Sequence, residues 1–531
     1  MSNDEMREMI AGLMVLGVPG IALDEGMRGL LSAGLAGAYL GGHNIHSRAQ
    51  LTTLTTAIQQ TRQQSAANVP GSALPKLILV EHEGGTVHHF GTIATHFPPP
   101  MALGATNSEE LARQVAEQMA AEVARLGVNC IVGPLFDRTS PSPRSSLGTR
   151  TFAAEPRTVG RLGAAMIRGY REAGVLSVAK HFPGLGRAHD EAHVATPTVL
   201  VDAAALAEDL DPFRDAVAAG VDVMMTAHAA YPTIGSGHLP ATLDPRITRL
   251  LREDVGFSGP VMTSDLTLTA VKRTGSYVAQ LARRALLAGA QLLLISDAGR
   301  HPEEIVDTLA RMAEADETLA AAVKAAHQIV VGLRERLAEP RSAEAESAEA
   351  TQALGRRGEE LARVVALQSI AVLGPTAFRP LQVAADDWLP VVLPQSQRNR
   401  FGNDPIRGHV GWFAEFILEY HSKLRVVNVG GLVSHLDRAR EATEGCSAAI
   451  VLLWASGPSA ERLCRELAAK VRQLYVLWLG RPQDAVDLPP WLPVLCTYGT
   501  SRASLWAAAR VLFGLESSGV RELPRLPSEE A

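Results

Sequence analysis

Residues 175–184 read Val-Leu-Ser-Val-Ala-Lys-His-Phe-Pro-Gly, and this stretch decides the fold of the first part of the chain. Its first five residues are apolar or small, which is typical of a buried strand in a parallel sheet. A lysine and a histidine follow at once, and a Pro-Gly pair then turns the chain. A buried strand that ends in polar residues and a loop is the repeating unit of an alternating α/β fold.

The same pattern occurs eight times in the first 300 residues. Each run is followed by polar or glycine-containing residues and then by helix-compatible sequence. The runs are Leu13–Val18, Gly37–Leu40, Lys76–Val80, Val128–Pro134, Val175–Lys180, Val221–Ala227, Pro260–Asp265 and Gln291–Ser296. Eight parallel strands close a barrel. We therefore predict the α/β fold class, with an N-terminal TIM-type (β/α)8 barrel followed by a smaller layered α/β domain.

Ionisable or polar side chains lie just past the ends of seven of these runs. They are His43 and Asn44, Glu81 and Glu83, Asp137, Lys180 and His181, His228, Ser264 and Asp265, and Asp297. A simpler interpretation, that polar residues mark the end of any strand, would suffice for one position. Seven occurrences favour a site at the C-terminal mouth of the barrel, where the βα loops gather.

A change in composition marks the end of the barrel. Residues 339–360 are rich in Ala, Glu, Arg and Ser and offer little to bury. We predict a barrel over residues 1–338, an exposed helical linker over 339–362 and a C-terminal α/β domain over 363–531. Strands of that domain are expected at Ile370–Leu373, Leu424–Val429, Ala448–Trp454, Leu474–Leu479 and Leu492–Thr497, and helices at Ala460–Gln473 and Ser501–Phe513.

Composition excludes several classes of partner. The chain has 50 Lys and Arg against 56 Asp and Glu, a formal net charge of -6, so we expect neither nucleic acid nor a membrane as partner. The apolar run near the N-terminus is broken by Gly17, Pro19 and Gly20, unlike a signal peptide or a membrane span. The four cysteines have no CxxC or zinc spacing, so we expect reduced thiols, no metal and a cytoplasmic location. The oligomeric state is left open.

Four segments resemble motifs of glycoside hydrolase family 3, in its bacterial β-N-acetylglucosaminidase branch. Residues 180–186, KHFPGLG, resemble the family's K-H-F-P-G-H-G, and residues 81–87, EHEGGTV, resemble its D-[QH]-E-G-G-R-V. Residues 148–152, GTRTF, are similar to G-x-R-x-F, and residues 227–232, AHAAYP, to A-H-x-x-Y-P. The order and spacing agree as well. The resemblance covers roughly residues 8–335 and extends more weakly into the C-terminal domain.

The resemblance implies a retaining glycosidase that uses no metal or organic cofactor and takes a small carbohydrate as ligand. His193 matches the histidine that acts as general acid/base, and Glu191 matches the carboxylate that orients it. Arg150, Lys180 and His181 match residues that hold the sugar. Glu81 would accept a hydrogen bond from a sugar hydroxyl, and His228 is expected to bind substrate with them.

The nucleophile segment departs from the family pattern. An ungapped register over residues 250–263 places Ser264 at the catalytic position and Asp265 one residue beyond it. In a regular strand the Asp265 side chain would then face away from the pocket. A serine hydroxyl with no base beside it cannot replace a carboxylate in forming a glycosyl-enzyme. A one-residue bulge would restore Asp265 to that position.

Two function classes therefore stay open. The first is a hydrolase that releases terminal N-acetylglucosamine from cell-wall or chitin-like fragments. The second is a catalytically impaired homologue that binds a sugar or a partner, an alternative that gains weight from Leu185, Thr86 and Glu81 at positions where the family has other residues. A hydrolase with changed sugar specificity would follow if Asp265 takes the nucleophile position. In each case Arg150, Lys180, His181 and His193 should converge at the barrel mouth, with Glu81 and Asp137 on its wall or floor.

Overall fold

The predicted parallel strands form one eight-stranded sheet. They are β1 (Met14–Gly17), β2 (Gly37–Leu40), β3 (Leu77–Val80), β6 (Cys130–Ile131), β7 (Leu176–Phe182), β8 (Val223–Thr226), β9 (Val261–Thr263) and β10 (Leu293–Ile295). Their order is β10-β1-β2-β3-β6-β7-β8-β9, and a bridge between Met262 and Leu292 joins the two ends. The strands are buried on both faces, so the sheet is a nearly closed, filled barrel.

These observations come from a computed structural model of the chain. It describes residues 2–61, 69–71, 73–139, 147–188, 196–272, 277–299, 301–337, 347–373, 378–394, 409–429, 436–455, 457–516 and 521–523.

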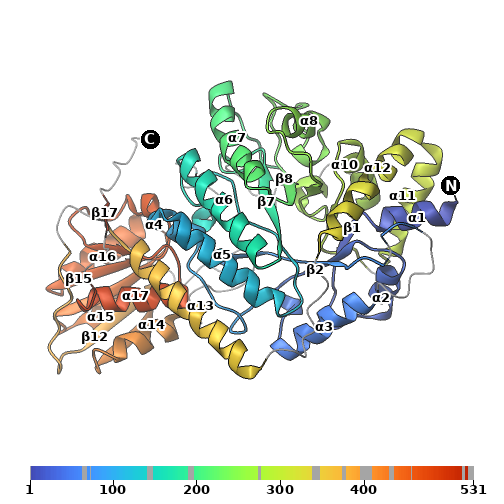
Figure 1. Cartoon of the computed structure of the whole chain (residues 1–531). Coiled ribbons are helices and arrows are strands. Elements are labelled where there is room, and N and C mark those ends of the chain that lie inside the picture. The colour runs from blue at the N-terminus through green and yellow to red at the C-terminus, as the bar shows by residue number, and fades with distance from the viewer. Residues whose placement is uncertain are drawn as a thin grey trace.

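Helices surround the barrel (Figure 1). They are α1 (Asn3–Ala11), α2 (Glu25–Ser32), α3 (Arg48–Gln60), α4 (Pro100–Thr106), α5 (Glu109–Ala124), α6 (Pro156–Glu172), α7 (Ala203–Ala218), α8 (Pro245–Glu253), α9 (Thr269–Lys272), α10 (Val278–Leu287), α11 (Glu303–Ala315) and α12 (Glu317–Glu335). Several begin with side-chain caps, such as Ser108 before α5 and Asp316 before α12, which satisfy free N–H groups of the first turn. A short hairpin, β4 (His82–Gly84) and β5 (Val87–His88), follows β3 at the barrel mouth.

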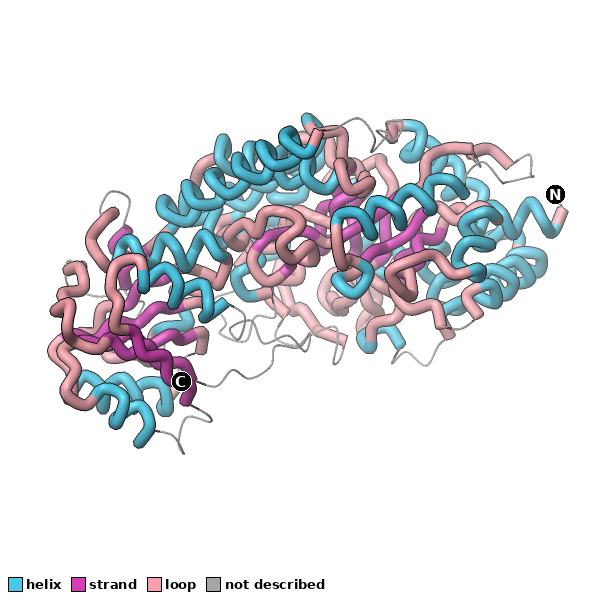
Figure 2. The backbone as a smooth tube through the Cα atoms, turned by 90° about the horizontal axis from the view of Figure 1, so that it is seen from below, coloured by secondary structure: helices cyan, strands magenta, loops and turns pink. Residues whose placement is uncertain are grey.

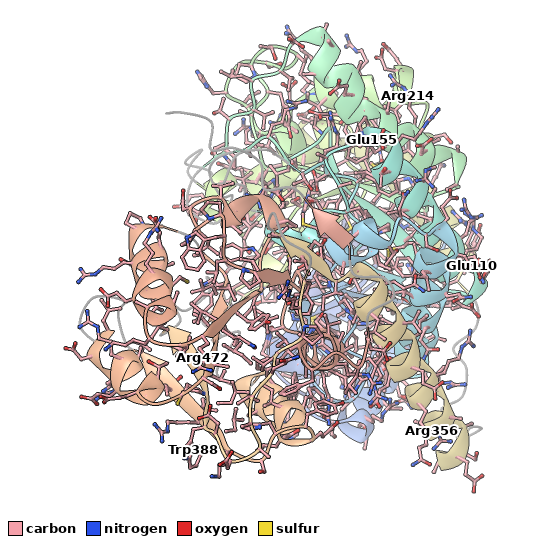
Figure 3. The ribbon with its side chains drawn as sticks, turned by 90° about the vertical axis from the view of Figure 1, so that its left-hand side faces the viewer. Glu110, Glu155, Arg214, Arg356, Trp388 and Arg472 are labelled. Atoms are coloured by element: carbon pink, nitrogen blue, oxygen red, sulfur yellow. The ribbon has the colours of Figure 1, made fainter. Side chains whose placement is uncertain are left out.

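The second unit is a seven-stranded mixed sheet with helices on its faces. Its strands are β11 (Ala371–Leu373), β12 (Leu389–Pro394), β13 (Leu424–Val429), β14 (Ala448–Leu453), β15 (Gln473–Trp478), β16 (Val494–Cys496) and β17 (Arg521–Leu523), in the order β13-β12-β14-β15-β16-β11-β17. Its helices are α14 (His409–Leu418), α15 (Leu436–Thr443), α16 (Pro458–Ala468) and α17 (Arg502–Leu512). The predicted fold class is thereby confirmed. In Figure 3, Trp388 and Arg472 mark the edge of this sheet where β12 and β15 begin.

One long helix, α13 (Ala348–Ser369), connects the two units (Figures 1 and 2). The helix includes residues 348–362 of the predicted linker, and it is not exposed all round. Gly358, Ala362 and Val365 are buried on the face that packs against α4, α5 and α17. This face of α13 therefore belongs to the packed interior between the barrel and the second sheet.

Candidate active site

Lys180 is the centre of a charged cluster at the C-terminal end of β7. Its side chain has no exposed area, and its Nζ lies 2.7 Å from Oε1 of Glu81 and 2.7 Å from Oε1 of Glu83. A buried ammonium is stable only when it is paired, and here two carboxylates pair with it. The peptide bond between Lys180 and His181 is cis.

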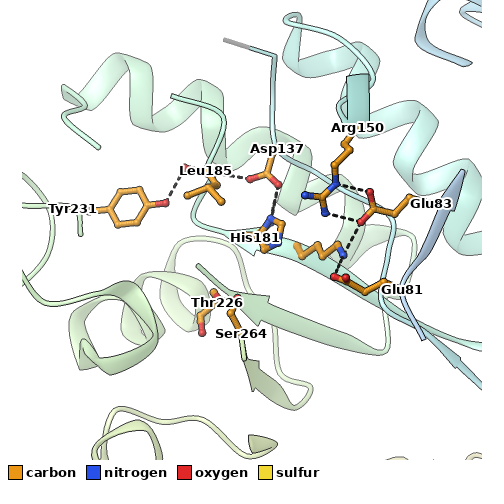
Figure 4. A network of polar contacts seen from close by, with 11 residues as sticks. Glu81, Glu83, Asp137, Arg150, His181, Leu185, Thr226, Tyr231 and Ser264 are labelled. Atoms are coloured by element: carbon orange, nitrogen blue, oxygen red, sulfur yellow. Dashed lines mark hydrogen bonds and ion pairs between the residues drawn. The ribbon is translucent and has the colours of Figure 1, made fainter. Parts of the chain in front are cut away.

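Arg150 is the second cation of the cluster and pairs with Glu83 (Figure 4). Its Nε and Nη2 donate to the two oxygens of Glu83 at 2.8 and 2.7 Å, a bidentate pair. Burial alone would raise the pKa of the Glu83 carboxyl, but Arg150 and Lys180 outweigh burial and lower it. Burial also raises the pKa of the Glu81 carboxyl. The charges of Lys180 and Arg150 lower it by more, so the pKa of Glu81 is well below its usual range. Both carboxylates are therefore ionised at neutral pH.

His181 lies beside this cluster and is held by Asp137. The Nδ1 of His181 is 2.8 Å from Oδ2 of Asp137, which is fully buried. The other carboxylate oxygen of Asp137 accepts from the backbone N–H of Leu185 at 2.6 Å. Asp137 thus lies beneath the turn that carries His181.

Tyr39 reaches the same region from β2. It is paired with Leu79 of β3, two residues before Glu81. The Tyr39 hydroxyl donates to Glu81. Burial, followed by the charges of Glu81 and Asp265, raises the pKa of Tyr39 well above its usual value. The negative charge of Asp265 thus acts on the Tyr39 hydroxyl.

Ser264 and Asp265 both lie beyond the end of β9, so strand alternation does not fix their directions. The Ser264 hydroxyl donates to the backbone oxygen of Thr226 at 2.7 Å, towards β8 (Figure 4). The Asp265 carboxylate turns the other way, towards β10. It accepts from the backbone N–H groups of Thr267 at 2.9 Å and Ser296 at 3.0 Å, and from both of their hydroxyls.

The backbone between β9 and β10 contains one extra residue at this point. Thr263 donates to the Leu292 oxygen, and a regular parallel ladder would continue from Asp265 to the Leu294 oxygen. Leu266 makes that bond instead, at 2.9 Å. The irregularity is of the kind that a bulge produces. The argument that a regular strand would turn Asp265 away from the pocket therefore does not apply here.

His228 is 1% exposed and lies under the Asp265 turn. Its Nε2 is 2.8 Å from the backbone oxygen of Asp265, and its Nδ1 is 2.9 Å from the Thr242 hydroxyl. Burial lowers the pKa of His228 to about 4, so the ring is neutral at pH 7. Both ring nitrogens are occupied within the protein, and the substrate contact expected from the sequence is replaced by a contact with the Asp265 backbone.

Three of the expected sugar-binding side chains have exposed area. The exposed fractions are 30% for Glu81, 20% for Arg150 and 13% for His181. The predicted general acid/base His193, and Glu191, which is predicted to orient it, lie outside the described residues. Within the described part of the chain, the mouth of the barrel thus offers a carboxylate, a guanidinium and an imidazole, groups that form hydrogen bonds with sugar hydroxyls.

Glu83 was among the polar residues expected at the barrel mouth, but the sequence assigned it no role, and Tyr39 was not expected there. The role of Glu83 as the partner of Lys180 and Arg150 appears only in the structure. Tyr39 could not have been found from the sequence, since its place depends on the pairing of β2 with β3. Among the described residues, no group of three or more His, Cys, Asp or Glu side chains could hold a metal ion. No described helix has both the length and the apolar character to cross a membrane.

Residues 6–333 match the sequence profile of the glycosyl hydrolase family 3 N terminal domain. The chain belongs to glycoside hydrolase family 3. The family membership expected from the motifs is thus confirmed, for a matched region that ends just before the predicted linker.

Relatives with names or solved structures extend the comparison. The beta-hexosaminidase of Thiobacillus denitrificans is 34% identical over 316 residues, which cover 57% of this chain and 82% of that protein. A family 3 β-N-acetylglucosaminidase structure from Paenibacillus sp. str. FPU-7 is similar with a TM-score of 0.83 at 27% identity, and 97% of each chain is covered. NagZ from Neisseria gonorrhoeae, in complex with N-trifluoroacetyl-D-glucosamine, has a TM-score of 0.55 at 26% identity, covering 66% of this chain and 98% of that one. These relatives are named as enzymes, which favours the hydrolase prediction over the non-catalytic alternative.

Proposed function

We propose that this protein is a retaining β-N-acetylhexosaminidase, which releases terminal N-acetylglucosamine from a β-linked oligosaccharide. The observation that carries the proposal is the Glu81–Lys180–Glu83–Arg150 cluster with His181 beside it, at the C-terminal end of the barrel strands. In this cluster Lys180 and Glu83 are buried supports, whereas Glu81, Arg150 and His181 have exposed area for a sugar. The named hexosaminidase relatives support the same substrate class.

The binding groups complement a hexosamine in hydrogen-bonding character. Arg150 can only donate, which suits a hydroxyl oxygen or the acetamide carbonyl. Glu81 is ionised and can only accept, which suits a hydroxyl O–H. Because Lys180, Glu83 and Tyr39 fix the positions of both groups, little side-chain freedom is lost when a sugar binds.

The retaining reaction needs a carboxylate at the anomeric carbon, and we propose Asp265 for that role. An Asp265 oxygen attacks C1, the bond from C1 to the leaving oxygen breaks, and the leaving oxygen takes a proton from His193, which Glu191 orients. His193 then removes a proton from water, and the water oxygen displaces Asp265 from C1. The proposal is supported by the extra residue before Leu266 and by the effect of the Asp265 charge on the Tyr39 hydroxyl. Ser264 offers no carboxylate.

Three finer points belong to the same proposal. The substrate is a cell-wall or chitin-like fragment, no organic cofactor takes part, and the protein works in the cytoplasm. Four free, buried cysteines are compatible with a reducing compartment.

The test uses the full-length protein with a panel of aryl glycosides. We expect hydrolysis of the aryl β-N-acetylglucosaminide in preference to the corresponding glucoside, galactoside and xyloside. Asp265→Asn should lower kcat by several orders of magnitude, whereas Ser264→Ala should cost no more than about tenfold. If the wild type is inert and Ser264→Asp gains turnover, Ser264 occupies the nucleophile position and the chain is a sugar-binding homologue.

A further inference from the structure

We propose that Asp137 is the positioning residue that decides which ring nitrogen of His181 faces the sugar. The inference deepens the proposed function, because it assigns the kind of sugar group that His181 recognises. It begins from one contact, the 2.8 Å between the Nδ1 of His181 and the Oδ2 of Asp137.

Three N–H groups converge on the carboxylate of Asp137, which has no exposed area (Figure 4). Besides the ring of His181, these are the backbone N–H of His181 at 3.1 Å and that of Leu185 at 2.6 Å. The carboxylate therefore contacts both ends of the turn 181–185. Its own segment is fixed in turn, since Phe136 donates its N–H to the backbone oxygen of Lys180 at 2.7 Å.

The middle of the turn is held from the opposite side. The Tyr231 hydroxyl donates to the backbone oxygen of Gly184 at 2.8 Å (Figure 4). With both sides anchored, His181 has little freedom to rotate away from Asp137. The ring direction is thus a property of the protein before any sugar arrives.

The contact between Asp137 and His181 also decides which ring nitrogen of His181 carries the proton. An ionised carboxylate can only accept, so in the neutral imidazole the proton must be on Nδ1. The other nitrogen, Nε2, then carries a lone pair. No described residue makes a hydrogen bond with this Nε2, and the ring retains exposed area. His181 thus presents an acceptor at the mouth of the barrel.

An acceptor at this position has a consequence for specificity. It takes a hydrogen bond from a sugar hydroxyl or from an acetamide N–H, and it rejects a carbonyl or carboxylate oxygen. With the proton on Nε2 the preference would be reversed. Arg150 supplies a donor nearby, so Asp137 makes the two neighbouring side chains differ in hydrogen-bonding character instead of duplicating each other.

The tautomer can be observed directly in ¹⁵N-histidine-labelled full-length protein at pH 8, with the His181 signals assigned by their loss in His181→Gln. We expect wild-type His181 to show a protonated Nδ1 and a bare Nε2. Asp137→Ala should shift population to the Nε2-protonated form. A wild type with Nε2 protonated, or an Asp137→Ala variant with unchanged His181 signals, would overturn the inference.

Two further variants keep the test decisive. Asp137→Asn preserves an oxygen for one of the backbone N–H groups, so it should fold even if the alanine variant does not, and it should also disturb the single tautomer. Asp222→Asn is the matched control. Asp222 is a buried carboxylate that accepts from Ser177 at the start of β7, the opposite end of that strand from His181, and pairs with Arg336, so its replacement should leave the His181 signals unchanged.

Activity gives a second, separate readout. On the aryl β-N-acetylglucosaminide, Asp137→Ala should raise KM on the order of tenfold, because one hydrogen bond to the sugar is disordered. If no glycoside is turned over at all, the proposed function fails while the spectra still decide the role of Asp137. If turnover is efficient but the tautomer does not depend on Asp137, only the present inference fails.

Discussion

Lys180 is the residue on which the charged cluster depends, because it is the cation that Glu81 and Glu83 share. Replacing it with methionine would preserve most of its volume and leave two carboxylates side by side with only Arg150 to balance them. Breaking a buried pair in this way typically costs about 3–5 kcal/mol. We expect the free energy of unfolding of Lys180→Met, from urea titration at pH 7.5, to fall by that amount.

An exposed ion pair provides the comparison. Arg465 and Glu461 lie 2.8 Å apart on the surface of α16, with 53% and 36% of their side chains exposed. Arg465→Met should change stability by less than about 1 kcal/mol. The deficit of Lys180→Met should also shrink at pH 5, since a proton can then replace the missing cation. Equal losses for the two variants would show that the cluster is not a stabilising unit.

His228 predicts how stability changes with pH. Its pKa is about 4 in the folded protein, against 6.5 for an ordinary histidine. As the pH falls below 6.5, the unfolded chain binds a proton that the folded chain does not. Stability is therefore complete above pH 6.5 and decreases towards pH 4, by about 3 kcal/mol over that range.

The variant His228→Gln isolates this contribution, because glutamine can replace both hydrogen bonds but does not titrate. Its free energy of unfolding should decrease less steeply than that of the wild type between pH 7.5 and pH 5. Other buried histidines, such as His82 and His327, act equally in both proteins and cancel in the difference. Parallel curves for the two proteins would contradict a buried neutral His228.

At the scale of elements, the sequence predicted all eight barrel strands but missed β12 and β17 of the second sheet. For β12 the reason is the pair Pro390 and Pro394, since proline lacks the N–H that an inner strand needs. In the structure β12 pairs with β14 only through Val391 and Val392, which lie between the prolines. Local composition could not show this, because the ladder that tolerates the prolines is formed with strands far away in the sequence.

The direction of the Asp265 side chain, between β9 and β10, could not be predicted from the sequence for a similar reason. Strand periodicity predicts side-chain direction only while the strand lasts, and β9 ends at Thr263. Beyond it, Asp265 is placed by donors from Ser296, thirty-one residues later. The residue types of the site were therefore predictable from motifs, whereas their directions depended on tertiary contacts. Glu191 and His193 remain predictions.

Helix α13 contains two glycines that should respond oppositely to the same substitution. A Cβ at Gly355 would meet no atom within 4 Å, so Gly355→Ala should stabilise the protein by about 0.5–1 kcal/mol. A Cβ at Gly358 would lie 2.1 Å from Oγ1 of Thr95 and 2.6 Å from Oε1 of Glu122. These two atoms are hydrogen-bonded to each other in the interior, so Gly358→Ala should destabilise by about 1–3 kcal/mol. The measurement is the melting temperature of each variant relative to the wild type. A higher melting temperature for Gly358→Ala would show that α13 does not pack closely against Thr95 and Glu122.

At the scale of the whole molecule, one continuous cluster of buried apolar side chains extends through both units. It includes Val80 of the barrel, Ala362 of α13 and Val451 of the second sheet. The two units also come close to each other near the site. A Cβ added at Gly499 of the second unit would lie 3.2 Å from the ring of Pro99. Pro99 in turn covers Gly85 in the β4–β5 turn, two residues after Glu83. The second unit thus supports the segment that carries the site carboxylates.

This continuity predicts that the two units unfold together, although the sequence suggests separate domains. The chain offers a convenient probe, because all six tryptophans, from Trp388 to Trp506, lie in the second unit. Tryptophan fluorescence therefore reports the second unit alone, and far-ultraviolet circular dichroism reports both. In the wild type the two thermal transitions should coincide, as expected for a single cooperative unit. In Gly358→Leu, which forces α13 away from Thr95 and Glu122, they should separate. Transitions that are already distinct in the wild type would mean that α13 is a tether between independent domains, and that the barrel folds without help from the second sheet.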